Sequence, residues 1–183
     1  IPLFKKNVSI GIQKHSKRAF RAHYTQNILA YLTHMDEQLE KLLTTIKSYN
    51  PDFDNQIVEK AFEFAKEKHE GQTRASGEPY YTHPVEVAQI LADMKMDVTT
   101  IVTAILHDTV EDTDATLDDL KKEFGKDVAD LVDGVSKLTR IESQTVEGKQ
   151  AENFRKLLLA MSEDIRVLLV KLSDRLHNMR TLH

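Results

Sequence analysis

The chain has 183 residues and a mass of 21.0 kDa, the length of one domain, and 40% hydrophobic residues are enough for one sizeable core. It contains no cysteine, which excludes disulfides, zinc ribbons and thiol nucleophiles, and no apolar run reaches the roughly 18 residues of a membrane span. The 25 basic and 29 acidic residues give a net charge of −4, which argues against nucleic acid binding through a basic face. We therefore expect a cytoplasmic protein that binds neither membranes nor nucleic acid.

The charge is divided unevenly along the chain. Residues 1–35 hold six basic residues and no acidic one, whereas the remainder holds 19 basic and 29 acidic residues. The apolar residues of this leader are scattered and no cleavage signal is evident, which argues against a transit peptide. We interpret residues 1–35 as a basic N-terminal extension, disordered or partly helical, ahead of a domain over residues 36–183.

From residue 36 onward, apolar residues recur at helical spacing, which predicts an all-α domain. With 6 Gly and 4 Pro, the chain has few turn signals, and this disfavours a many-stranded β-sandwich. The first two predicted helices carry the stripes Leu39, Leu42, Leu43, Ile46 and Ile57, Val58, Ala61, Phe62, Ala65. Asn50-Pro51 separates the two helices, and Gly71 ends the second as a left-handed cap.

The third predicted helix has Thr82 as its N-cap, with Pro84 close behind, and runs through Leu91 to Met94. Asp97 caps the fourth, whose apolar positions are Ile101, Ala104, Ile105 and Val110. Thr116 and Asp119 have the spacing of a capping box and open a short helix that ends at Gly125.

The remaining chain predicts three more helices. They cover residues 127–135, 151–161 and 165–179, and a long polar loop over 136–149 follows the first of them. Within 165–179, Val167 to Val170 alone would fit a strand, but the continuation at Leu172, Leu176 and Met179 fits helical spacing. The expected fold is a bundle of about eight or more helices with few or no strands.

The densest chemistry lies where an apolar helix becomes His107-Asp108-Thr109-Val110-Glu111-Asp112. On a helix, His107 would share a face with Glu111, and Asp108 with Asp112. Two like charges about 4 Å apart cost roughly 4 kcal/mol at a dielectric constant of about 20, so such a cluster needs solvation, protonation or a cation. Alternatively, the helix simply ends here and residues 111–119 form a solvated acidic loop.

Two further groups add to the cluster if the fold brings them near it. His83 lies in Tyr81-Thr82-His83-Pro84, and Asp174 lies in a Lys171-Leu-Ser-Asp-Arg-Leu-His-Asn178 segment. Singly, His83 would be a helix-start residue and Asp174 an ion-pair partner. With His107 and Asp108 they form a mixed nitrogen and oxygen ligand set that suits Mn²⁺, Fe²⁺ or Zn²⁺ better than Ca²⁺.

The order of a His, then His-Asp, then a distant Asp resembles the HD superfamily of metal-dependent phosphohydrolases. Residues 71–83, 107–112, 130–138 and 171–182 are together similar to the hydrolase domain of the RelA/SpoT family, which makes and degrades the alarmone (p)ppGpp. The resemblance runs from about Leu39 to the end of the chain. No synthetase region follows, so synthetase activity is not expected, and the hydrolase domain is expected to be cut short near His183.

The resemblance implies a role for nine residues. His83, His107, Asp108 and Asp174 match metal ligands, with Mn²⁺ the family's usual ion, and Glu111 and Asp112 match the pair that activates the attacking water. Arg74, Ser76 and Asn178 match contacts to the guanine nucleotide, whereas Ala75 stands where some members have Lys. We further expect Lys137, Lys171 and Arg175 to line the entrance of the site. The simpler interpretation places Lys137 and Lys171 on the solvated surface, and Arg175 could equally pair with Asp112 or Glu111 inside the site.

The implied reaction is the Mn²⁺-dependent hydrolysis of ppGpp or pppGpp to GDP or GTP and pyrophosphate. The rival hypotheses are another HD-type nucleotide phosphohydrolase and a non-catalytic remnant that binds the alarmone. His177 would either orient a metal ligand from behind or be an ordinary core or surface histidine, and we assign no role to His69.

Overall fold

The computed structural model describes residues 37–74, 77–143 and 164–181. By its packing the chain divides after Glu37, and the predicted extension over 1–35 and the predicted helix over 151–161 lie outside the described residues. The described part is helical apart from its loops and one isolated β-bridge between Thr73 and Pro79, which confirms the predicted all-α class. No helix in the described ranges is long and apolar enough to cross a membrane.

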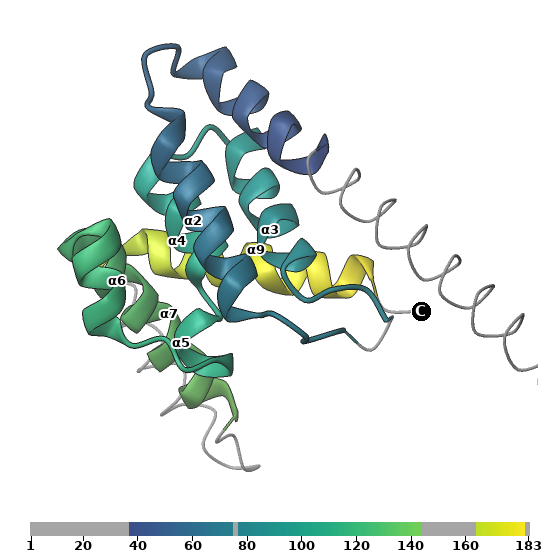
Figure 1. Cartoon of the computed structure of the whole chain (residues 1–183), viewed down its shortest axis with the longest axis vertical. Coiled ribbons are helices and arrows are strands. Elements are labelled where there is room, and N and C mark those ends of the chain that lie inside the picture. Colours follow the sequence, from purple (N-terminus) through teal and green to yellow (C-terminus); the bar gives the residue numbers. More distant parts are fainter. Residues whose placement is uncertain (1–36, 75–76, 144–163, 182–183) are drawn as a thin grey trace, which may run out of the picture. The chain divides into compact units, whose positions relative to one another are not determined.

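Figure 1 shows the helices in chain order. The first helical stretch covers residues 37–49. The helices that follow are α2 (Asn55–Lys68), α3 (Thr82–Asp93), α4 (Val98–Leu106), α5 (Thr109–Asp112), α6 (Leu117–Phe124), α7 (Lys126–Ser143) and α9 (Ile165–Arg180).

The helix starts are set by side-chain caps. Asp97 accepts a hydrogen bond from the Thr100 backbone N–H, and Thr116 and Asp119 form a reciprocal capping box, as the sequence predicts. The prediction for Thr82 is wrong by one residue, because Tyr81 is the N-cap of α3 and the Thr82 hydroxyl instead donates to the Pro79 carbonyl. This helix ends at Asp93, with Met94 as its C-cap.

Three further helix ends differ from the sequence prediction by two residues or more. Helix α2 ends at Lys68 with His69 as its C-cap, before the predicted cap Gly71, although Gly71 does adopt a left-handed backbone with a φ of 79°. The helix expected to continue through Val110 ends at Leu106, and the chain bends at His107 and Asp108 before α5 begins at Thr109. The polar loop expected from residue 136 is wrong at its start, because α7 continues to Ser143. Its buried Leu138 follows the buried Val135 by three residues, so the apolar stripe continues past the polar Ser136 and Lys137.

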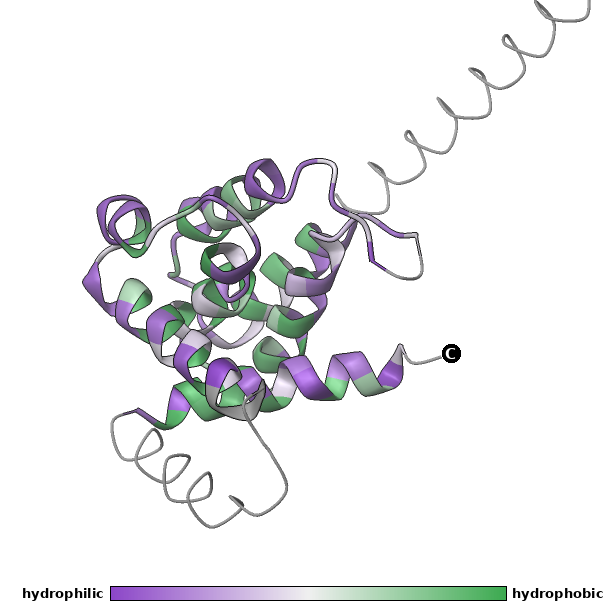
Figure 2. Ribbon diagram, turned by 90° about the horizontal axis from the view of Figure 1, so that it is seen from below, coloured by the Kyte–Doolittle hydropathy of each residue, from purple (hydrophilic) through white to green (hydrophobic). Residues whose placement is uncertain are grey.

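Helix α4 forms the centre of the fold. All residues from Thr100 to Leu106 are buried, which is expected of a helix surrounded by protein. It packs against α2, α3, α7 and α9, and α9 also packs against α3 and α7. Figure 2 shows the hydrophobic helix faces turned towards one another and hydrophilic residues on the outside. The bend at His107 and Asp108 follows directly on this buried helix.

Candidate metal centre

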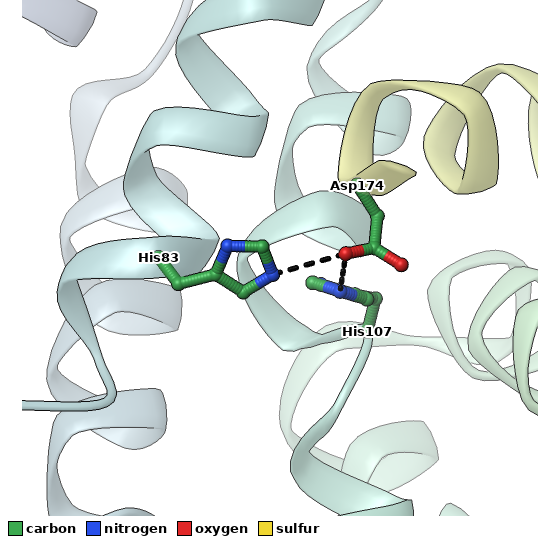
Figure 3. Close-up of side chains that lie close together, drawn as sticks. All are labelled: His83, His107 and Asp174. Carbon is green, nitrogen blue, oxygen red and sulfur yellow. Dashed lines mark hydrogen bonds and ion pairs between the residues drawn. The ribbon is translucent and has the colours of Figure 1, made fainter. Parts of the chain in front are cut away.

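Three separate segments bring four predicted ligands together. His83 lies in the first turn of α3, His107 and Asp108 occupy the bend between α4 and α5, and Asp174 lies in the middle of α9. Figure 3 shows His83, His107 and Asp174 converging on one point. Their exposed fractions are 3%, 1% and 5%, so the cluster is buried at the edge of the core.

The distances show how tightly the polar atoms converge. The Nε2 atom of His83 lies 3.1 Å from Asp174 Oδ1 and 3.9 Å from Asp108 Oδ2. The Nε2 atom of His107 lies 3.0 Å from Asp108 Oδ1 and 4.0 Å from Asp174 Oδ1. Two imidazole nitrogens and two carboxylates thus face one another, although His83 and Asp174 are 91 residues apart in the sequence.

The tautomer of His107 follows from its surroundings. Its Nδ1 atom lies 2.7 Å from the carbonyl oxygen of Ala104, and a carbonyl only accepts, so Nδ1 carries the proton. In the neutral ring, Nε2 is then an unprotonated acceptor. This atom is buried and has no hydrogen-bond partner, although two carboxylates stand in front of it.

The residues present fit a bound cation. A neutral imidazole nitrogen and carboxylate oxygens that all accept would repel one another, and a metal ion or an extra proton between them removes that repulsion. Without a cation, the proton takes this place. Burial alone would lower the pKa of His107, but the charges of Asp108 and Asp174 and the contact with Asp108 outweigh burial and raise that pKa to about 9.

The other three groups remain in the state that a metal ligand needs. Burial lowers the pKa of His83 and keeps the ring neutral. Burial alone would raise the pKa of both carboxyl groups, but His107 holds that of Asp108 well below its usual range. The His83 and His107 rings and the Lys171 ammonium do the same for Asp174. Neutral imidazole and ionised carboxylate are the forms that bind divalent cations.

A cavity of about 290 Å³ opens beside the cluster. It is lined by Arg74, Tyr80, His83, Asp108, Glu111, Asp112, Thr139, Lys171, Asp174 and Asn178. Its four carboxylates outnumber its two fixed cations, so a divalent cation would balance the charge of the lining. Both Glu111 and Asp112 lie at this cavity, where the sequence predicts the water-activating pair.

Glu111 and Asp112 have different environments. Glu111 is half-buried and its Oε1 atom has no hydrogen-bond partner, while burial and then the Asp108 charge raise its pKa. Asp112 is exposed, and its Oδ2 atom lies 2.9 Å from the Tyr80 hydroxyl. The same hydroxyl lies 2.9 Å from Asp108 Oδ2. Burial and these carboxylates raise the pKa of Tyr80, so the hydroxyl stays protonated between them.

The predicted nucleotide contacts are in part brought together. Arg74 Nη2 donates to Asn178 Oδ1 at 2.8 Å, and Asn178 Nδ2 donates to Asp174 Oδ1 at 2.7 Å, so both residues adjoin the cluster. Ser76 and Ala75 lie outside the described residues.

The three basic residues expected at the entrance have different outcomes. Lys171 is 9% exposed and donates to Asp174 Oδ2 at 2.8 Å, so the solvated-surface reading is wrong for it. Lys137 does not line this cavity; it pairs with Asp133 and lines a different one. Arg175 is exposed and does not line the site either.

Sequence reasoning missed Tyr80 and underestimated His177. The His177 Nδ1 atom lies 2.7 Å from His83 Nδ1 and 3.3 Å from Arg74 Nη1, directly behind a predicted ligand. The Tyr80 ring stacks on the fully buried His69 with centroids 4.6 Å apart. One signal was available for His177, because it stands three residues after Asp174, about one turn along the same helix. Tyr80 precedes α3, so helical spacing gives no such signal for it.

Comparison with known proteins identifies the family of the chain. A family model described as HD domain matches residues 61–183. The chain is 54% identical over 143 residues to the bifunctional (p)ppGpp synthase/hydrolase SpoT of Escherichia coli, covering 78% of this chain and 20% of that protein. It is 53% identical over 150 residues to a GTP pyrophosphokinase of Myxococcus xanthus, covering 80% of this chain and 20% of the relative.

A solved structure, described as a metazoan ortholog of SpoT that hydrolyzes ppGpp and plays a role in starvation responses, superposes with a TM-score of 0.53. It is 31% identical, over 70% of this chain and 71% of the other. The chain therefore belongs to the HD domain family. Within that family it belongs with the RelA/SpoT proteins, and it spans about a fifth of the length of the curated relatives it matches.

Proposed function

We propose that the protein is a (p)ppGpp 3′-pyrophosphohydrolase, which converts ppGpp or pppGpp and water into GDP or GTP and pyrophosphate. The observation that carries this proposal is the buried cluster of His83, His107 and Asp174, with the partly exposed Asp108 in contact with both histidines, beside a cavity of about 290 Å³. The names of the SpoT relatives supply the substrate class.

We propose His83, His107, Asp108 and Asp174 as the ligands of one divalent cation, and Mn²⁺ as that cation rather than Fe²⁺ or Zn²⁺. The mixed imidazole and carboxylate set is compatible with all three. When bound, such an ion polarises a phosphoryl oxygen and lowers the pKa of water.

We propose Glu111 as the group that takes the proton from the attacking water, with Asp112 orienting that water. The raised pKa and unpartnered Oε1 of Glu111 support this division, because a general base works best when its pKa approaches the working pH. Asp112 already accepts from Tyr80, which leaves it better placed to orient than to exchange a proton. The new bond joins water oxygen to phosphorus, and the bond from phosphorus to the ribose 3′ oxygen breaks. That oxygen takes up a proton and becomes the 3′ hydroxyl of GDP or GTP, while pyrophosphate leaves.

Arg74, Ser76 and Asn178 are proposed to bind the nucleoside. A planar guanidinium stacks well on a purine, and Arg74 is only partly exposed at the rim of the cavity. The buried Lys171 contributes positive charge on the side of Asp174, where a polyphosphate needs it. We place this activity in the cytoplasm, on a small nucleotide and not on nucleic acid.

A substrate panel tests the proposal. The chain with Mn²⁺ is incubated separately with ppGpp, GMP and a cyclic nucleotide, and the products are separated. We expect GDP and pyrophosphate in equal amounts from ppGpp only. Turnover of GMP or the cyclic nucleotide instead would make the protein a different HD-type phosphohydrolase. Binding of Mn²⁺ without any turnover would make it a non-catalytic alarmone-binding module.

A further inference from the structure

His177 is a half-buried residue of α9 that the proposed reaction leaves without a role. Its ring lies beside the ring of His83, with centroids 4.8 Å apart. Its Nδ1 atom is 2.7 Å from His83 Nδ1 and 3.3 Å from Arg74 Nη1. The His177 Nδ1 atom thus contacts both His83, a predicted metal ligand, and Arg74, a predicted nucleotide-binding residue.

The direction of both hydrogen bonds follows from Arg74. A guanidinium only donates, so the His177 Nδ1 atom must accept. Two acceptors cannot share a hydrogen bond, so the nitrogen of His83 that faces it, Nδ1, must carry the proton. The neutral His83 ring is then unprotonated at Nε2, although Asp174 Oδ1 lies 3.1 Å from that atom and a carboxylate favours a proton there. A cation between Nε2 and Asp174 would take the place of that proton and remove the conflict.

A second path ties the same residues together. Arg74 donates to Asn178, and Asn178 donates to the carboxylate of Asp174, so a chain of hydrogen bonds links two predicted ligands through Arg74. Asn178 supports Asp174 within this chain of hydrogen bonds. His177 supports His83, and it comes from the helix that carries Asp174, so it also fixes the distance between these two ligands.

We propose that His177 is a positioning residue that holds His83 in the Nδ1–H tautomer and turns its Nε2 atom to the cation. This inference rests on the cation site of the proposed function and not on the identity of the substrate. A hydrogen-bond partner behind a ligating histidine is typically worth 10- to 100-fold in metal affinity.

The test compares His177→Ala with His177→Asn. Asn places its amide oxygen close to the position of a histidine Nδ1 atom and accepts, whereas Ala does not. We expect His177→Ala to weaken Mn²⁺ binding by about 10- to 100-fold and His177→Asn to retain most of the affinity. Ala has the higher helix propensity, so a weaker Ala variant is not explained by a frayed α9. Affinity is measured by titration calorimetry, and thermal unfolding in chelator checks that each variant is folded.

A spectroscopic readout keeps the inference testable if the Ala variant does not fold. In chelated, ¹⁵N-labelled protein, the ring nitrogen shifts of His83 distinguish the two tautomers. We expect Nδ1–H in the unsubstituted chain and in His177→Asn. The inference is overturned if His83 is protonated at Nε2 in the unsubstituted chain, if His177→Ala binds Mn²⁺ unchanged, or if a folded His177→Asn binds as weakly as the Ala variant. Neither readout uses ppGpp, so Mn²⁺ binding as expected without pyrophosphate release would refute the proposed function alone.

Discussion

At the scale of single residues, the predicted ligands are oriented by hydrogen-bond partners that are not themselves predicted ligands. The Ala104 carbonyl sets the proton of His107, and the Tyr80 hydroxyl lies between Asp108 and Asp112. Lys171 and Asn178 each donate to one oxygen of Asp174. These contacts hold acceptor atoms close together, at an energetic cost that a bound cation offsets.

The raised pKa of His107 predicts a pH dependence of metal binding. In the metal-free protein the ring is charged below its pKa of about 9, and a ligating imidazole must be neutral, so the proton and the cation compete. Raising the pH removes the competing proton, and Mn²⁺ affinity should rise up to about tenfold per pH unit until pH about 9. Titration calorimetry at pH 6.5 to 8.5, in buffers of different ionisation enthalpy, measures both affinity and protons released. A pH-independent affinity with no proton release would contradict the assignment.

The Tyr80 hydroxyl predicts a second effect at this scale. Tyr80→Phe keeps the ring stacked on His69 but removes the donor shared by Asp108 and Asp112. We expect Mn²⁺ affinity to fall by about 10- to 100-fold with little change in thermal unfolding in chelator. Tyr81→Phe is the matched control, because Tyr81 does not line the cavity. Equal affinities for both variants would show that the Tyr80 hydroxyl does not position the carboxylates.

The sequence was most informative for residues that carry chemistry and least for those that support them. His83, His107, Asp108 and Asp174 stand in separated motifs with a recognisable order, so their proximity was predictable. Tyr80 and His177 act through directed hydrogen bonds, and whether an aromatic or histidine side chain points inward depends on helix packing that composition does not reveal. Lys171 was expected near the site and does line the cavity, but its contact with Asp174 depends on how α9 is turned and was not predictable from its charge.

At the scale of helices, the close approach of α7 and α9 depends on Gly134. A Cβ atom at this position would lie 2.7 Å from Cγ2 of Val167, closer than real contacts allow. Val is stiff about χ1 in a helix, so one of the helices must move. Since α9 carries Asp174, this contact connects a packing detail to the site.

The Gly134 contact predicts that the effect of Gly134→Ala on stability depends on whether residue 167 is Val or Ala. Gly134→Ala alone gains about 1 kcal/mol in helix propensity but incurs an overpacking cost of about 1 to 3 kcal/mol, so we expect no gain or a net loss of stability. In a Val167→Ala background the clash is gone, and the same change should stabilise by about 1 kcal/mol. Denaturant unfolding of the unsubstituted chain, the two single variants and the double variant measures the free energy of unfolding in both backgrounds. Stabilisation of similar size in both backgrounds would refute the clash.

Helix positions were predictable where local signals agreed, and boundaries were not where tertiary contacts decided. The caps at Asp97 and Thr116 follow from residue type and spacing alone. The extension of α7 beyond Val135 does not, because a Ser-Lys pair resembles a loop start until Ser136 is seen to be buried. The bend at His107 was not predicted, because Val110 keeps the helical spacing of apolar residues beyond Leu106, where α4 ends. This bend brings His107 and Asp108 close to α3 and α9.

At the scale of the molecule, charge explains how an acidic domain would accept a polyanion. The chain from residue 36 onward carries ten more acidic than basic residues, and four carboxylates line the cavity with two fixed cations. A divalent cation balances that lining. The same cation would link α3, the bend after α4, and α9, so it should also stabilise the fold.

Metal removal is therefore predicted to destabilise the whole domain. A ligand that binds only the folded state at 100 times its Kd adds about 2.7 kcal/mol. We expect thermal unfolding to shift upward with Mn²⁺ and to return on adding EDTA. Asp174→Asn serves as the control, and its unfolding temperature should be the same in Mn²⁺ and in EDTA. An unsubstituted chain that is insensitive to Mn²⁺ would argue against a cation shared by these helices.

The central claim is that a cation held by His83, His107, Asp108 and Asp174 supports removal of the 3′-pyrophosphate. The most direct measurement is pyrophosphate release from ppGpp as Mn²⁺ is added to metal-free protein, with Asp108→Ala in parallel. We predict that release rises with Mn²⁺ until the site is filled, yields one GDP per pyrophosphate, stops on chelation, and is lost in Asp108→Ala. Pyrophosphate release that persists in chelator or in Asp108→Ala, or no release from protein saturated with Mn²⁺, would contradict it.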